Sequence, residues 1–159
     1  MEKQLQITFE EWPGREALPA DDRQLLDAAE QAAHGAYAPY SHFHVGAAIR
    51  LAEGTIVTGN NQENAAYPSG LCAERTALFA ASANHPGNRD MTAIAIIGIN
   101  HQGQLCQASP CGSCRQAMAE YENLQPHPIR VICYVNDHCI RCFHSVASLL
   151  PFAFDLQSD

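Results

Sequence analysis

The chain has 159 residues with 47% hydrophobic content, and its 9 basic and 17 acidic residues give a net charge of −8. This length fits one domain with a full core, and no apolar run is long enough to span a bilayer. Because a protein that grips a nucleic-acid backbone usually has a basic face, the charge argues against a nucleic-acid partner and favours a small molecule without phosphate.

The N-terminus and the cysteines bear on the compartment. Met1–Gln4 lacks the basic-then-apolar pattern of a signal peptide. The seven cysteines are an odd number, which fits a reducing compartment better than a disulfide framework. We therefore expect a soluble cytoplasmic protein with no membrane partner.

The N-terminal part of the chain divides into an extension and the start of a domain. We assign residues 1–20 to an N-terminal extension, which could add an edge strand or lie over the surface, and residues 21–159 to one catalytic domain. Asp21 or Asp22 is expected to cap a helix that runs to about His34.

A hairpin and a polar loop are expected next. Strands are predicted at Val45–Leu51 and Thr55–Gly59, with a turn between them. The polar loop Asn60–Pro68 follows. It has two interpretations: ordinary surface turn chemistry, or amide and carboxylate groups that hold sugar hydroxyls.

The second half of the chain alternates between helices and strands. Helices are predicted from Cys72 to about Asn84 and from Cys111 to about Asn123. The strands and the last helical turn are predicted at Met91–Ile99, Ile129–Val135, Cys139–Phe143 and Val146–Leu150. This order indicates an α/β layered domain, with a sheet of about five strands covered by helices.

Three cysteines and one glutamate form the pattern that carries chemistry. Cys72-Ala73-Glu74 and Pro110-Cys111-Gly112-Ser113-Cys114 each precede or open a predicted helix. A catalytic zinc takes three protein ligands and leaves one position for water, and three thiolates satisfy that count. Glu74 lies close enough to handle protons without being a ligand. Arg75 could donate hydrogen bonds to the sulfurs and offset their negative charge.

Other interpretations of the cysteines stay open. The site could be a structural zinc centre closed by a fourth Cys or His, although such a site has no use for Glu74. The three cysteines could also be unrelated buried residues. A second pair, Cys139 and Cys142, lies three apart on a predicted strand, where the side chains point to opposite faces. We interpret that pair as ordinary cysteines.

From about Tyr37 to Phe154, the sequence resembles the small cytidine deaminases with a three-cysteine zinc site. The resemblance lies in several long motifs in the same order, and the Cys-x-Glu and Pro-Cys-x-x-Cys pattern is the signature of zinc nucleobase deaminases. The matching segments are Ala36-Tyr37-Ala38-Pro39-Tyr40-Ser41-His42-Phe43, Val45-Gly46-Ala47-Ala48, Asn61-Gln62-Glu63-Asn64-Ala65-Ala66-Tyr67, Cys72-Ala73-Glu74-Arg75-Thr76-Ala77, Pro110-Cys111-Gly112-Ser113-Cys114-Arg115-Gln116 and Leu149-Leu150-Pro151.

The resemblance implies a fold, a reaction and a cofactor. The fold is a three-layer α/β/α sandwich with a mixed sheet. The reaction is the hydrolysis of cytidine and deoxycytidine to uridine and deoxyuridine in pyrimidine salvage. One Zn²⁺ per subunit is held by Cys72, Cys111 and Cys114, and Glu74 moves protons between water, ring N3 and the leaving ammonia.

The resemblance also implies the substrate contacts and the assembly. Phe43 packs against the pyrimidine, Asn61 and Glu63 bind the ribose 3′-hydroxyl, and the backbone of Ala73 reads the base carbonyl. Family members are homotetramers that share active sites, and the positions expected to contribute are Ala65, Tyr67 and Phe154, with Phe152 as an alternative to Phe154. His44 departs from the family, because proline is usual there.

Three alternative functions are weighed against this one. A deaminase of a modified cytosine nucleoside, of the blasticidin S type, shares the three-cysteine site, but the Asn61-x-Glu63 pair speaks against it. RNA or DNA editing conflicts with the acidic charge. A non-catalytic zinc protein that binds nucleosides would not need Glu74.

Overall fold

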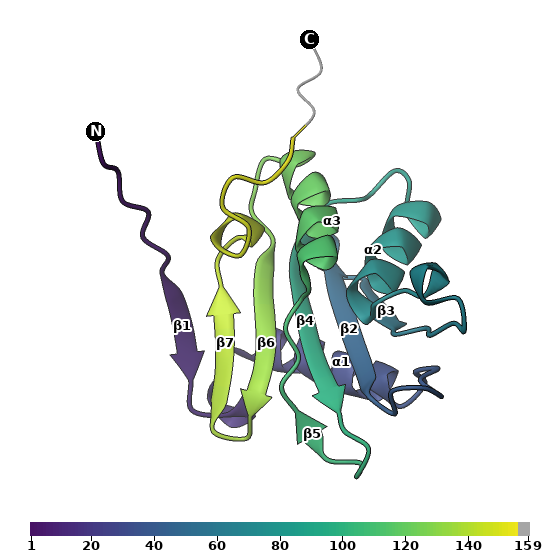
Figure 1. Ribbon diagram of the computed structural model, residues 1–159. Coiled ribbons are helices and arrows are strands. Elements are labelled where there is room, and N and C mark those ends of the chain that lie inside the picture. Colours follow the sequence, from purple (N-terminus) through teal and green to yellow (C-terminus); the bar gives the residue numbers. More distant parts are fainter. Residues whose placement is uncertain (156–159) are drawn as a thin grey trace.

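The computed structural model describes residues 1–155, and residues 156–159 lie outside the described part of the chain. A seven-stranded mixed sheet runs through the centre, in the order β1-β7-β6-β4-β2-β3, with β5 paired to β4 (Figure 1). The strands are β1 Phe9–Trp12, β2 His44–Leu51, β3 Ile56–Asn60, β4 Met91–Ile99, β5 Leu105–Cys106, β6 Arg130–Asn136 and β7 Cys139–Phe143.

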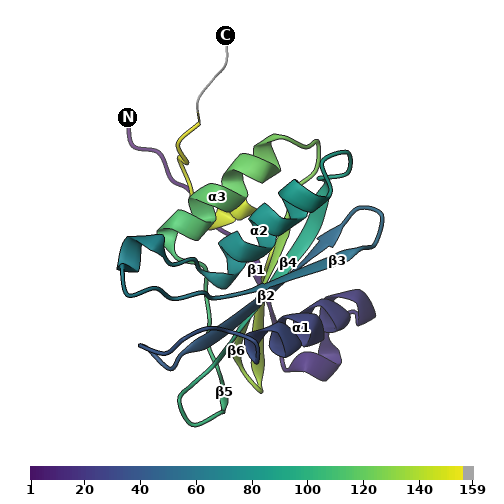
Figure 2. The same ribbon diagram turned by 90° about the vertical axis from the view of Figure 1, so that its right-hand side faces the viewer.

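Helices cover both faces of the sheet, which confirms the predicted α/β/α sandwich. The helix α1 (Ala20–Ala33) lies on one face, while α2 (Ala73–Asn84) and α3 (Gly112–Asn123) lie side by side on the other (Figure 2). Two separate clusters of buried residues fill the two interfaces. No helix within residues 1–155 is long and apolar enough to cross a membrane.

The central strand β4 forms the middle of both cores. Seven of its nine residues are fully apolar or glycine and buried in succession from Ala93 to Ile99, because helices pack on both sides of it. It pairs in parallel with β6 and antiparallel with β2. Its predicted bounds are confirmed residue for residue.

The sheet has two more strands than the expected five. The first, β5, is only two residues long and pairs with Gly98 and Ile99 of β4. The second, β1, comes from the predicted N-terminal extension and pairs antiparallel with β7. The sequence of neither strand has a strong strand pattern of its own. Both strands form because the rest of the sheet provides a free edge to pair with.

Ion pairs hold β1 and α1 to the sheet, and they correct the predicted helix cap. Arg130 of β6 contacts Glu10 at 2.7 Å and Asp22 at 2.9 Å. The residue that precedes α1 is Pro19, which makes no side-chain capping bond. The prediction that Asp21 or Asp22 caps this helix is therefore wrong: Asp22 is buried and pairs with Arg130 instead.

Glycine at position 59 allows the helix α2 to approach the sheet closely. A Cβ atom on Gly59 of β3 would collide with the backbone of Ala73 and Ala77 in α2. The absence of a side chain at this point lets the first turn of α2 lie directly on β3. The start of α2 is thereby placed next to the polar loop that follows β3.

One carboxylate joins α3 to the C-terminal part of the fold. Glu122 accepts hydrogen bonds from the backbone N–H groups of Ile129 at 2.7 Å, Val146 at 2.9 Å and Ala147 at 3.2 Å, and from the Ser145 hydroxyl at 2.7 Å. Its loss leaves several part-buried donors without their acceptor.

We expect Glu122→Ala to lower the free energy of unfolding by about 3 kcal/mol, because hydrogen bonds to a charged group contribute about 1.5–3 kcal/mol. Urea denaturation followed by circular dichroism measures the change. Glu120→Ala, an exposed residue of the same helix, is the control and should stay within about 0.5 kcal/mol of the wild type. Equal effects of the two substitutions would contradict the role of Glu122.

Candidate metal centre and active site

The three cysteines meet where two helices begin. Cys72 immediately precedes α2 and Cys111 immediately precedes α3, each with extended backbone. Cys114 lies in the first turn of α3, on the same side as Cys111. The N-terminal ends of helices carry partial positive charge, which favours negatively charged metal ligands placed there.

The spacing of the sulfurs fits one tetrahedral zinc ion. The Sγ atoms of Cys72, Cys111 and Cys114 all lie within 4.8 Å of one another. The Sγ–Sγ distance is 3.9 Å from Cys72 to Cys111 and 3.5 Å from Cys111 to Cys114. Zinc–sulfur bonds of about 2.3 Å in a tetrahedron put two ligand sulfurs about 3.8 Å apart. The donor set therefore suits zinc.

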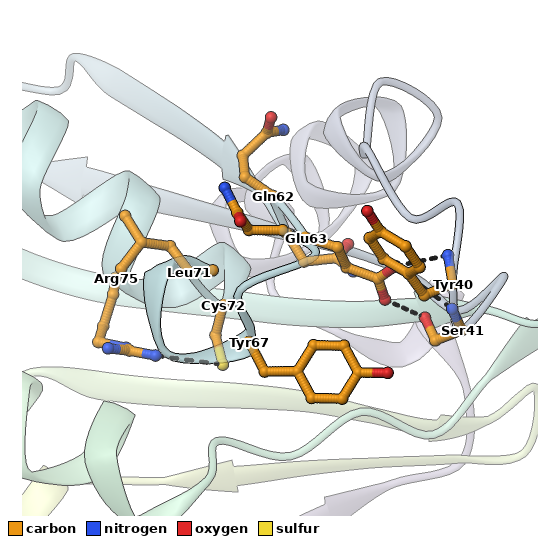
Figure 3. Close-up of a pocket in the computed structure, with 11 residues that line it drawn as sticks. Tyr40, Ser41, Gln62, Glu63, Tyr67, Leu71, Cys72 and Arg75 are labelled. Carbon is orange, nitrogen blue, oxygen red and sulfur yellow. Dashed lines mark hydrogen bonds between the residues drawn. The ribbon is translucent and has the colours of Figure 1, made fainter.

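Arg75 places a positive charge beside the sulfurs. Its Nη2 lies 3.8 Å from Cys72 Sγ, as Figure 3 marks. Hydrogen bonds from Cys114 and from Arg75 lower the pKa of Cys72 to about 5. The contact with Cys72 raises the pKa of Cys114, because the two sulfurs share one proton. The guanidinium of Arg75 is thus in position to stabilise negative charge on the metal ligands.

Glu74 is a buried carboxylate beside this cluster. Only 4% of the residue is exposed to solvent. Burial, with the negative charge of Cys72 acting in the same direction, raises the pKa of Glu74 to about 7. A carboxyl group that is neither firmly protonated nor firmly ionised near neutral pH is suited to take up and release a proton.

A cavity of about 370 Å³ opens above Glu74 and the cysteines. A volume of this order suits a small ligand rather than a polymer. The cavity brings together residues from the loop before β2, the end of β3, the start of α2 and the segment before α3. Its lining residues are Ser41, Phe43, Val45, Asn61, Glu63, Cys72, Ala73, Glu74, Gln107, Ala108, Ser109 and Cys111.

A second cavity of about 490 Å³ adjoins the first and shares Ser41, Asn61, Glu63 and Cys72 with it. Figure 3 looks into this second cavity, which Tyr40 and Tyr67 flank. The two tyrosine rings lie edge to face with centroids 6.3 Å apart. The polar loop after β3 therefore faces two hollows on the same side of the molecule.

The structure brings most of the predicted site residues together. Phe43, Asn61, Glu63 and Ala73 line the same cavity as Glu74, and Tyr67 lines the adjoining one. The metal-ligand candidate Cys114 lines neither cavity and is fully buried. Two predicted substrate contacts line neither cavity: Ala65, which is exposed, and Phe154, which is 71% exposed near the C-terminus.

Sequence reasoning missed several lining residues. Ser41 and Val45 lie within two residues of Phe43 in the sequence, and this proximity could have pointed to them. Gln107, Ala108 and Ser109 directly precede the Pro110-Cys111 motif, and only that proximity could have pointed to them. Their side chains carry no pattern of their own.

The cysteine pair of β7 stays outside this site. Cys139 is half-buried and Cys142 is fully buried, with the alternation expected of a strand. Within residues 1–155, the only group of three or more potential ligands close enough for a metal is Cys72, Cys111 and Cys114. The expectation that Cys139 and Cys142 point to opposite faces is confirmed.

Comparisons with known proteins agree with this arrangement. A model of the family described as "Cytidine and deoxycytidylate deaminase zinc-binding region" matches residues 19–125. A cytidine deaminase of Mycobacterium tuberculosis is 40% identical over 140 residues, which are 86% of this chain and 92% of that protein. A cytidine deaminase of Halalkalibacterium halodurans is 47% identical over 100 residues, or 63% of this chain and 71% of that protein.

Solved structures are similar across most of the chain. The crystal structure of cytidine deaminase from Burkholderia pseudomallei superposes with a TM-score of 0.70 at 42% sequence identity, covering 82% of this chain and 97% of that one. A crystal structure of cytidine deaminase from M. tuberculosis gives a TM-score of 0.68 at 34% identity, with coverage of 87% and 100%.

Proposed function

This chain belongs to the cytidine and deoxycytidylate deaminase family, and we propose that its reaction is the hydrolysis of cytidine and deoxycytidine to uridine and deoxyuridine, with release of ammonia, in pyrimidine salvage. The enzyme is a hydrolase with zinc as its cofactor. The observation that carries the proposal is a group of three zinc-binding sulfurs beside a buried carboxylate, at the wall of a cavity sized for a small molecule.

The proton transfers are assigned to Glu74. Zinc, when held by the three cysteines, lowers the pKa of water towards neutrality and so supplies a nucleophile. Water adds at C4 of the cytosine ring, and the C4–N4 bond breaks as ammonia leaves. Glu74 takes a proton from the attacking water and delivers it to N3. It then takes the proton of the new C4 hydroxyl and passes it to the departing amino group, which leaves the C4 carbonyl of uracil. Burial of Glu74 supports both transfers, because it keeps the pKa near 7.

The substrate contacts follow the lining of the cavity. Phe43 packs against the pyrimidine ring, Asn61 and Glu63 bind the ribose hydroxyl, and the backbone N–H of Ala73 reads the base carbonyl. All four residues line the same cavity as Glu74, which supports one common ligand. An uncharged nucleoside also suits an acidic protein better than a polynucleotide does.

A homotetramer with shared active sites completes this proposal. Tyr67 is 77% exposed beside the second cavity, and Phe154 is 71% exposed. The Gln116 side chain of α3 donates to the carbonyl of Phe154 at 2.9 Å and accepts from its N–H at 3.3 Å. This fixed backbone favours Phe154 over Phe152 as the residue that reaches a neighbouring subunit. Analytical ultracentrifugation should give a four-subunit mass, and a monomeric species would refute the shared site.

The compartment is proposed from the cysteines. All seven are free in the structure, and a reducing cytoplasm keeps thiols and zinc thiolates in this state. The alternative functions lack a comparable observation, whereas Asn61, Glu63 and Glu74 line one cavity, as a catalytic nucleoside site requires.

The deciding experiment follows the absorbance change as cytosine becomes uracil in cytidine, using purified, zinc-loaded protein. Conversion establishes the reaction class, and a parallel assay with deoxycytidine measures the preference between the two sugars. A folded protein with one bound zinc that converts neither nucleoside would refute the proposal.

A further inference from the structure

Both the oxygen and the nitrogen of the Asn61 side-chain amide form hydrogen bonds with the loop that carries Phe43. Its Oδ1 accepts a hydrogen bond from the N–H of Val45 at 2.7 Å, and its Nδ2 donates to the carbonyl of Phe43 at 2.9 Å. The backbone N–H of Asn61 also donates to the carbonyl of Val45, at 3.2 Å. One residue, immediately after β3, therefore holds the segment on both sides of His44.

Glu63 holds the other end of the same loop. Its carboxylate accepts from the backbone N–H groups of Tyr40 at 2.9 Å and Ser41 at 3.3 Å, and from the Ser41 hydroxyl (Figure 3). The Ser41 hydroxyl oxygen in turn accepts from the N–H of Phe43 at 3.1 Å. The loop Tyr40–Val45 is thus bonded at both ends to the two residues expected to bind ribose.

The ring of Phe43 lies close to Gly98 of β4, where Cys106 of β5 also approaches. A Cβ atom on Gly98 would lie 3.0 Å from Phe43 Cζ and 3.1 Å from Cys106 Sγ. A side chain at position 98 would therefore have to displace the Phe43 ring or Cys106. Glycine at position 98 therefore leaves room for the ring, while Asn61 and Glu63 hold the loop that carries it.

The backbone between these anchors adopts a conformation that needs support. His42 has a φ of 54°, in the left-handed region that side chains other than glycine rarely adopt. Such a conformation is unfavourable for a residue with a side chain and persists only when its surroundings fix it. The hydrogen bonds of Asn61 and Glu63 on either side of His42 provide that support.

We propose that Asn61, together with Glu63, is a positioning residue that holds the Phe43 loop in its base-stacking position before a nucleoside binds. The inference rests on the proposed function, because it takes Phe43 as the surface that meets the pyrimidine. Each amide group of Asn61 keeps one hydrogen or lone pair for a ribose hydroxyl, so the two roles coexist. Preorganisation of this kind raises affinity by removing the cost of ordering the loop on binding.

The test compares two substrates in the zinc-loaded full chain carrying Asn61→Asp. Aspartate still accepts from Val45 but cannot donate to the carbonyl of Phe43. We expect kcat/KM to fall about tenfold, mostly through KM, which is the effect of losing about one hydrogen bond. The same fall is expected with 2′,3′-dideoxycytidine, which lacks the 3′-hydroxyl that Asn61 is expected to bind. Hydrogen exchange of the amides in residues 40–46, measured without nucleoside, should become faster.

Controls separate the possible outcomes. Asn136→Asp alters an amide that also accepts from a backbone N–H, but in the distant turn between β6 and β7, and should leave both substrates unaffected. Asn61→Ser removes both loop bonds without adding charge, and it replaces Asn61→Asp if that variant does not fold. An unchanged kcat/KM with dideoxycytidine would mean that Asn61 acts through ribose alone, and would overturn the proposal.

Failure of the proposed function gives a different result. If the wild type converts neither cytidine nor deoxycytidine, hydrogen exchange still tests the loop. Faster exchange of residues 40–46 in Asn61→Asp then supports the positioning role, and unchanged exchange overturns it.

Discussion

Replacement of Glu74 by glutamine is expected to lower kcat for cytidine by about 10³-fold, within the range typical for the loss of a general acid–base group. Glutamine has nearly the same shape, but its amide can neither take the proton of water nor deliver one to N3. The residue is 4% exposed, so bulk water cannot easily replace it as the proton carrier. KM and zinc content should stay close to those of the wild type, since Glu74 is not among the three sulfur ligands.

Steady-state absorbance assays and metal analysis of the same preparation measure these quantities. Glu120→Gln, an exposed position on α3, is the matched control and should retain full activity. A Glu74→Gln enzyme with more than a tenth of the wild-type kcat would remove Glu74 from the proton transfers.

Removal of one sulfur ligand is expected to abolish both zinc binding and activity. Cys114→Ala leaves two thiolates and should weaken zinc binding by more than about 100-fold, since substitutions of residues that merely support a ligand cost about 10–100-fold. The melting temperature should also fall, because Cys72 and Cys111 sit at the starts of α2 and α3 and a shared ion joins these helices.

Cys142→Ala is the matched control for this prediction. Cys142 and Cys114 are both fully buried, but Cys142 packs in the core on the α1 side of the sheet. It should lose some stability to the cavity and keep one zinc per subunit. Full zinc content in Cys114→Ala after dialysis would show that the three-sulfur assignment is wrong.

The elements predicted best are those whose signal is local. The bounds of α2, α3 and β4 follow from helix-forming residues after Cys72 and Cys111 and from an unbroken apolar run, and the structure reproduces them. The short strands β1 and β5 escaped a firm prediction, because a strand of two to four residues exists only where a partner edge is available. The role of Asp22 was predicted wrongly because it too depends on a distant partner: Arg130 is 108 positions away in the chain.

The sequence by itself determined the chemistry of the site. Cys111 and Cys114 share one helix face whatever the rest of the fold does, and Glu74 follows Cys72 at a fixed short distance, because helix geometry is local. Only the tertiary structure decided how these pieces meet. The sheet brings Cys72 next to Cys111 and buries Glu74, which raises its pKa to about 7. It also sets Asn61 and Glu63 against the Phe43 loop, since hydrogen bonds between distant segments depend on how the chain packs.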